Sequence, residues 1–182
     1  MEKEKITRPK AARVVALVGI MAATLECGKL VLSFLPNIEV VTLLCALYGY
    51  VFGIWGVAAA AVFVCIEPLI YGFGSWLITY IIYWPSVAFI FMLLSRRGVR
   101  GRLPLTAVAL GMTLIFGILS SVIDSAFYLG INENYLANLV IFYARGAVFY
   151  AAQLAINAVL FPTLFPILVK KLGQIKSSQA LL

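Results

Sequence analysis

The chain has 182 residues, of which 64% are apolar and 12% are charged, and it carries a formal net charge of +7. Its mean hydropathy of +1.06 excludes a soluble domain with a polar exterior. Because a membrane-spanning helix needs about 20 residues, the length allows about six spans and no separate soluble catalytic domain. We therefore expect an all-α membrane protein, a six-transmembrane-helix bundle in which residues 1–182 form a single transmembrane domain.

The apolar segments of the sequence predict six helices, separated by glycine, proline and polar residues. The first ends before Pro36, because proline disfavours the helical region for the residue that precedes it. The second is short and ends at Gly53, where we expect a tight turn or a kink. The sixth contains Pro162 and Pro166 and is too long for one simple crossing, so we expect its end to bend or to lie along the membrane interface. The expected ranges, in chain order, are 11–33, 40–52, 54–70, 76–94, 105–129 and 135–169.

The basic residues gather mainly in three short clusters at the ends of apolar segments, at 3–13, 96–102 and 170–176. This is the pattern of the positive-inside rule, under which basic loops stay in the cytoplasm. All three clusters share one side if four helices precede the middle cluster and two follow it. We therefore expect both termini in the cytoplasm, and the loops without lysine or arginine outside. These outer loops are 35–39, 71–75 and 130–135.

Five charged residues lie inside the predicted spans, where a charge costs about 2.5–3.5 kcal/mol and normally faces a cavity or a partner. They are Glu26, Lys29, Glu67, Asp124 and Arg145. All five fall in the outer halves of their helices, near tyrosine and tryptophan residues. An aromatic pocket with a few polar anchors is typical of small-molecule sites. The predicted substrate-binding residues are Asn37, Glu67, Tyr71, Trp76, Tyr80, Tyr83, Trp84, Asp124, Tyr128, Asn138 and Arg145.

A purely structural interpretation of the same residues stays open. Tyrosine and tryptophan commonly form a belt at the membrane interface. Asp124 with Arg145, or Glu26 with Lys29, would then be structural ion pairs. The segregation of five charges to one half of the bundle favours a pocket.

Small residues recur along one face of the first helix, as Ala12, Ala16, Gly19 and Ala23. Such a face allows another helix to approach closely. We predict that these four residues bind a partner protein, with packing inside the chain's own bundle as the alternative.

Several chemistries are excluded by the sequence. No G-x-x-x-x-G-K-[ST] motif occurs, so the chain does not hold ATP phosphates by that device. The sequence has no histidine, which removes the commonest transition-metal ligand and any Ser-His-Asp triad. We therefore expect no catalytic residue, no metal site and no cofactor acting as a catalyst.

Three short motifs suggest a family. Ala12-x-x-x-Ala16, residues 36–39 (PNIE) and residues 49–53 (GYVFG), together with six short spans and a basic N-terminus, resemble the substrate-binding (S) component of energy-coupling factor (ECF) vitamin transporters. The resemblance implies a subunit in the plasma membrane of a prokaryote that captures a vitamin from outside. It also implies two kinds of partner, a transmembrane coupling subunit (the T component) and two cytoplasmic ABC ATPases.

The resemblance assigns further roles. In that family the alanine motif contacts the coupling subunit, which here means Ala12 and Ala16, and the ligand site lies between the outer parts of helices 4 to 6. Residues 67–74 and 80–85 look most like those of cobalamin-type members, so cobalamin is the expected ligand, bound through its ring and side-chain amides without imidazole. Pyridoxine, pantothenate and a queuosine precursor stay open as ligands.

A membrane enzyme or assembly factor that handles a lipid or prenyl group is the alternative from a different class. It predicts titratable groups near the cytoplasmic interface or an acidic metal-binding cluster. The acidic residues within the predicted spans are instead dispersed on the outer side, which favours transport.

The predicted topology can be tested by cysteine labelling. In a variant whose three native cysteines are replaced by alanine, a membrane-impermeant maleimide applied to intact cells should label Asn132→Cys. The same reagent should label Gly98→Cys only after the cells are permeabilised, because the arginines around Gly98 hold that loop in the cytoplasm. Labelling of Gly98→Cys from outside would contradict the topology.

Overall fold

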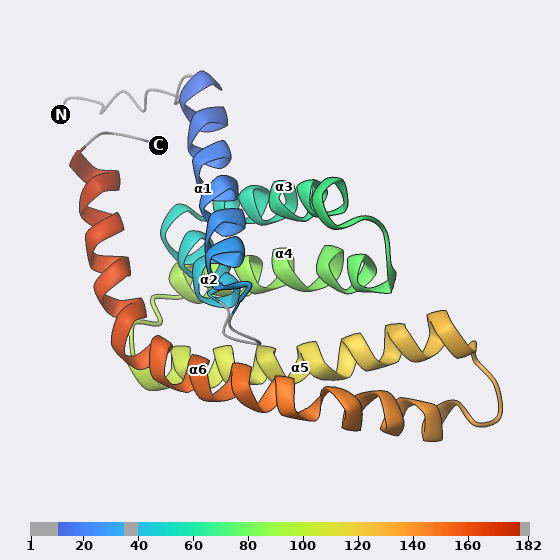
Figure 1. Ribbon diagram of the computed structural model, residues 1–182. Coiled ribbons are helices and arrows are strands. Elements are labelled where there is room, and N and C mark those ends of the chain that lie inside the picture. The colour runs from blue at the N-terminus through green and yellow to red at the C-terminus, as the bar shows by residue number, and fades with distance from the viewer. Residues whose placement is uncertain (1–10, 35–39, 179–182) are drawn as a thin grey trace.

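The computed structural model describes residues 11–34 and 40–178, and within them the fold is all-α (Figure 1). Two ends of the bundle can be distinguished. The basic end carries the turn at Gly53 and the loop at 97–101, and the aromatic end carries the turns at 72–74 and 130–134. The six helices are α1 (Ala11–Leu32), α2 (Val41–Phe52), α3 (Ile54–Tyr71), α4 (Ser75–Arg96), α5 (Arg102–Leu129) and α6 (Tyr135–Ser178).

Helix α2 lies at the centre and touches each of the other helices. It has 12 residues, and most of them are buried. Its close packing depends on two glycines. A side chain at Gly49 would lie 1.9 Å from the carbonyl oxygen of Ala88 in α4, and one at Gly56 in α3 would lie 2.2 Å from the carbonyl of Tyr48. The backbones of α2, α3 and α4 are therefore in direct contact, as is common between membrane helices.

The turn between α2 and α3 consists of one residue. Gly53 follows the last residue of α2 and precedes the first residue of α3. Its φ of 64° lies in the left-handed region, which other residues adopt only with strain. Its amide donates a hydrogen bond to the carbonyl of Gly49 over 3.0 Å and closes α2. The expected tight turn at this position is confirmed.

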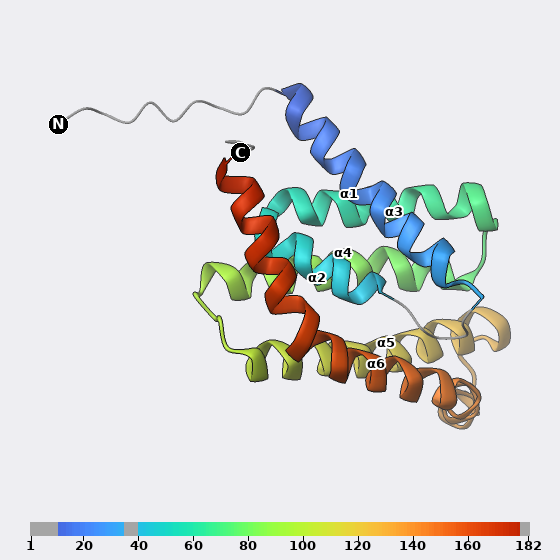
Figure 2. The same ribbon diagram turned by 60° about the vertical axis from the view of Figure 1, so that its left-hand side comes forward.

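Helix α1 crosses α3 obliquely instead of running parallel to it (Figures 1 and 2). Only Met21, Ala22, Leu25 and Glu26 of its 22 residues are buried. The small residues Ala12, Ala16, Gly19 and Ala23 are all exposed. Within the described residues, the alternative in which this stripe packs inside the chain's own bundle is therefore not supported.

Helices α5 and α6 form a hairpin whose free end lies apart from the turn between α3 and α4 (Figure 1). A buried hydrogen bond joins the two helices. The side-chain amide of Asn157 donates to Oγ1 of Thr113 over 3.0 Å, and Asn157 is fully buried. Beyond Pro162 and Pro166 the last part of α6 turns away from the direction of α5 (Figures 1 and 2). Its Lys176 donates a hydrogen bond to the carbonyl of Val51, 2.9 Å away, and so holds the end of α2.

The structure corrects the expected end of the sixth helix and confirms that the second helix is short. Helix α6 does not end near residue 169 but continues to Ser178, and its 44 residues correspond to about 66 Å at 1.5 Å per residue. Helix α2 is only about 18 Å long by the same measure, against about 30 Å of membrane hydrocarbon. Five helices of the described residues are long and apolar enough to cross a membrane, and α2 is not among them. The expected six full crossings are therefore not confirmed.

The close contact at Gly49 leads to a stability prediction. Gly49→Ala should lower the free energy of unfolding in detergent by about 1–3 kcal/mol, because the added methyl group forces α2 and α4 apart. Gly111→Ala in α5 is the matched control, since no heavy atom lies within 4 Å of the position of its added methyl group. The control should change stability by less than about 1 kcal/mol. Equal effects of the two substitutions would contradict the packing described.

Candidate functional site

An ion pair joins α1 to α3 near the aromatic end. Nζ of Lys29 contacts Oε2 of Glu67 and donates a hydrogen bond to it. The Glu67 side chain is 0% exposed and that of Lys29 is 25% exposed. The carboxylate is thus inside the protein, while the ammonium lies at the edge of the bundle. This pair replaces the predicted pairing of Lys29 with Glu26, because the crossing of α1 over α3 brings a buried carboxylate within reach.

Three aromatic rings surround the Lys29 ammonium. The distance from Nζ to the ring centre is 3.9 Å for Tyr71, 5.4 Å for Tyr80 and 6.0 Å for Trp76. A cation within about 6 Å of a ring face is attracted by the electrons of that face. The aromatic rings therefore help to hold a charge that the membrane interior would otherwise exclude.

A second carboxylate, that of Glu26, adjoins the ion pair. Glu26 is 8% exposed, and neither of its carboxylate oxygens accepts a hydrogen bond from the described residues. Glu67 and Tyr71 lie close enough to Glu26 to interact with it electrostatically and through weak side-chain hydrogen-bond contacts. Oε1 of Glu67 also lacks a partner among the described residues. Because buried polar atoms are normally hydrogen-bonded, these three oxygens are available as acceptors for a bound molecule that donates N–H or O–H groups.

A small cavity of about 90 Å³ extends from Lys29 into the bundle. Nε1 of Trp84 is a buried donor without an acceptor among the described residues. The indole ring of Trp84 lies 5.5 Å from the Tyr80 ring. The cavity thus has the charged side chain of Lys29 at its opening and aromatic side chains along its wall. The residues that line it are Lys29, Val41, Phe63, Tyr80, Trp84, Phe116 and Gln153.

A larger cavity of about 670 Å³ lies between α5 and α6 near the aromatic end. The hydroxyl of Ser75 donates a hydrogen bond to Asp124 over 2.6 Å, which ties the start of α4 to α5. The Arg145 guanidinium lies 5.7 Å from the centre of the Phe142 ring. Asp124 and Arg145 face the same cavity but form no ion pair, so the structural pair of the alternative interpretation is absent. The lining residues are Asp124, Tyr128, Phe142, Arg145, Gly146, Phe149 and Tyr150.

A series of aromatic contacts connects the two cavities. Tyr80 lies 6.5 Å from Phe116, and Phe116 lies 6.4 Å from Tyr150, measured between ring centres. Phe116 lines the small cavity and Tyr150 lines the large one. Tyr83 packs against the same Phe116 ring at 4.8 Å. One aromatic surface therefore runs from the Lys29 cluster to the cavity of Asp124 and Arg145.

The structure brings most of the predicted site residues together. Asn138 lies on α6 and lines neither of these two cavities, and Asn37 lies outside the described residues. Around the Lys29 cluster and the small cavity are Glu67, Tyr71, Trp76, Tyr80, Tyr83 and Trp84. Around the large cavity are Asp124, Tyr128 and Arg145.

The residues of these cavities and of the cluster that were not among the predicted site residues are Glu26, Lys29, Val41, Phe63, Phe116, Phe142, Gly146, Phe149, Tyr150 and Gln153. Glu26 and Lys29 could have been included, since a charge inside a predicted span is itself a signal. The polar Gln153 in the middle of a long apolar helix is a weaker signal of the same kind. Phe116 and Tyr150 carry no signal, because aromatic residues are common throughout such helices.

No protein-family profile, curated protein or solved structure matches this chain. The candidate site is therefore interpreted from its own geometry and chemistry.

The buried ion pair leads to a prediction about stability. Lys29→Met should lower the free energy of unfolding by about 3–5 kcal/mol, because it leaves the Glu67 carboxylate buried without its cation. The double variant Lys29→Met with Glu67→Leu should regain part of that loss, since the fully buried Glu67 carboxylate is then removed together with its cation and only the carboxylate of Glu26 remains. Lys171→Met, which removes an exposed lysine of α6, is the control and should have an effect within about 0.5 kcal/mol. A Lys29→Met variant as stable as this control would contradict the assignment.

Proposed function

We propose that the chain is a multi-pass membrane protein that captures a vitamin at its aromatic end, as the S component of an ECF-type transporter. The observation that carries the proposal is the group of three buried carboxylate oxygens without partners beside an aromatic-lined cavity. Such a group adds nothing to stability by itself, since burying an unsatisfied polar atom costs free energy. A ligand that donates hydrogen bonds would offset that cost.

The chemistry of the site restricts the ligand. Glu26 and Glu67 accept hydrogen bonds and favour N–H donors, while Arg145 at the large cavity donates to oxygen acceptors. The aromatic surface between them suits a flat ring. Cobalamin, with a broad ring and several side-chain amides, is the first candidate. Pyridoxine, pantothenate and a queuosine precursor offer similar groups on smaller frameworks.

The exposed small-residue stripe supports a protein partner. Ala12, Ala16, Gly19 and Ala23 leave one face of α1 open, and the neighbouring Val15 and Ile20 are 71% and 63% exposed. A second helix can approach this face closely. We assign the face to the transmembrane coupling subunit, and ATP hydrolysis to two separate cytoplasmic ABC ATPases, because this chain has no ATP-binding motif. The plasma membrane of a prokaryote is the corresponding location.

The test begins with the purified protein. Mass spectrometry of retained small molecules identifies a captured ligand, and titration with the four candidates, followed by quenching of tryptophan fluorescence, measures affinity. Glu26→Gln and Arg145→Gln should each weaken binding about 10- to 100-fold, because a hydrogen bond to a charged group contributes about 1.5–3 kcal/mol.

Ala16→Leu is the matched control for the site. It should leave ligand affinity within about twofold and disrupt co-purification with a coupling subunit, since leucine keeps a partner helix at a distance. Binding of none of the four candidates, or unchanged affinity in both Glu26→Gln and Arg145→Gln, would overturn the proposal.

A further inference from the structure

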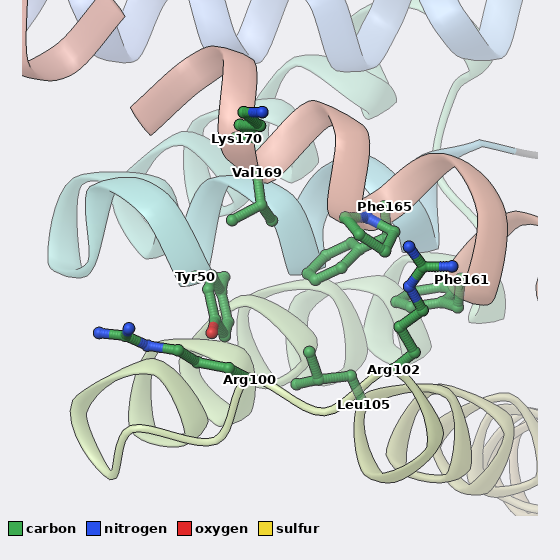
Figure 3. Close-up of a pocket in the computed structure, with 9 residues that line it drawn as sticks. Tyr50, Arg100, Arg102, Leu105, Phe161, Phe165, Val169 and Lys170 are labelled. Carbon is green, nitrogen blue, oxygen red and sulfur yellow. The ribbon is translucent and has the colours of Figure 1, made fainter. Parts of the chain in front are cut away.

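A separate cavity of about 260 Å³ lies at the basic end, between the loop at 97–101, the start of α5 and the bent part of α6. Arg100, Arg102 and Lys170 line it, and none of its lining residues is acidic. Figure 3 shows Arg100 and Arg102 on opposite sides of Leu105, with Lys170 on α6. Three exposed, positively charged side chains therefore border the cavity from different sides, and no negative one lies among its lining residues.

None of these three cations has an ion-pair partner within the described residues. The first turn of α5 adds partial positive charge, because its preceding residue Gly101 provides no side-chain cap. The hydroxyl of Tyr50 donates to the carbonyl of Val99 over 2.8 Å and holds the arginine loop against α2. The backbone of the arginine loop is therefore held by the fold, and the exposed arginine side chains are free of ion pairs with the described residues.

The rest of the cavity is apolar. Phe161 and Phe165 are 0% and 1% exposed, and their rings lie 5.2 Å apart. Just outside the cavity Leu103 is 81% exposed, next to Arg102. A free inorganic anion gains nothing from such apolar walls, whereas a molecule that joins a phosphate to hydrocarbon matches both parts. The apolar lining residues are Leu105, Phe161, Phe165, Pro166 and Val169.

We propose that this cavity binds the phosphate group of an anionic phospholipid, which the exposed side chains of Arg100, Arg102 and Lys170 approach from different sides, with the acyl chains along the accessible apolar residues of α5 and α6. A phospholipid and a soluble phosphate ester would present the same phosphate group to this cavity. The apolar walls favour the phospholipid, because only the lipid has hydrocarbon to place against them. Basic pockets between membrane helices at the cytoplasmic face bind anionic head groups in this way. The site is independent of substrate capture, because it lies at the opposite end of the bundle.

Native mass spectrometry of the detergent-purified protein, titrated with phosphatidylglycerol or with phosphatidylcholine, tests the proposal. The wild-type protein should retain one phosphatidylglycerol at concentrations where phosphatidylcholine is lost. Arg100→Gln combined with Arg102→Gln should weaken retention about 25-fold, about fivefold for each arginine. The matched control is Arg96→Gln combined with Arg97→Gln, which removes the same charge from the same segment without touching the cavity and should change retention less than twofold.

Three outcomes of this experiment would overturn the proposal. Equal losses in the two double variants would show attraction by the basic loop as a whole and no site. Equal retention of the two lipids would show that the charge of the head group is not recognised. Displacement of phosphatidylglycerol by millimolar inorganic phosphate would assign the cavity to a soluble anion. Unchanged thermal unfolding of both double variants in lipid-free detergent ensures that losses of retention reflect the site.

Discussion

The fold depends on the direct backbone contact that α2 makes with α3 and α4 at Gly49 and Gly56. Helices in a membrane gain little from burying apolar surface, since lipid is also apolar, so close packing of small residues holds them together. Helix α2 is too short to cross hydrocarbon alone, and it is covered by the other helices. Its burial explains why its sequence is apolar on all sides and carries no charge.

A second constraint comes from charge in an apolar medium. Lys29 and Glu67 join the otherwise lightly packed α1 to α3, and an ion pair of this kind specifies position more than it adds stability. The carboxylate of Glu26 is not needed for this pair, because the single ammonium of Lys29 lies near two carboxylates. The aromatic end has an excess of negatively charged carboxylates, whereas the basic end has an excess of positively charged side chains. The two ends are therefore suited to different molecules.

The sequence was sufficient for the number and order of the helices, because hydrophobic segments and the glycines at 53, 72 and 130 mark their limits. It was not sufficient for the end of α6, since the apolar segment stops at Val169 whereas the helix continues through the basic residues Lys170 and Lys171 to Ser178. The cluster of intramembrane charges could be predicted, but their pairing could not. Glu26 and Lys29 are three residues apart and favour a local pair, whereas the crossing of α1 over α3 is set by tertiary packing. Phe116 and Tyr150 were missed for the same reason.

The hydrogen bond between Asn157 and Thr113 limits how the α5–α6 hairpin can move. Sliding one helix past the other by a turn would leave an amide and a hydroxyl unpaired in an apolar interior, at a cost of about 1–3 kcal/mol. Spreading the helices at the Gly130 end leaves this bond intact, because Thr113 and Asn157 lie far along the hairpin from that turn. Spreading would break the hydrogen bond that the Tyr135 hydroxyl donates to the carbonyl of Val122 over 3.1 Å, so the Gly130 end of the hairpin is held by one bond and the register of the two helices by another. Breaking the bond at Tyr135 would make the half-buried Asp124 more accessible and leave the buried centre of the hairpin unchanged.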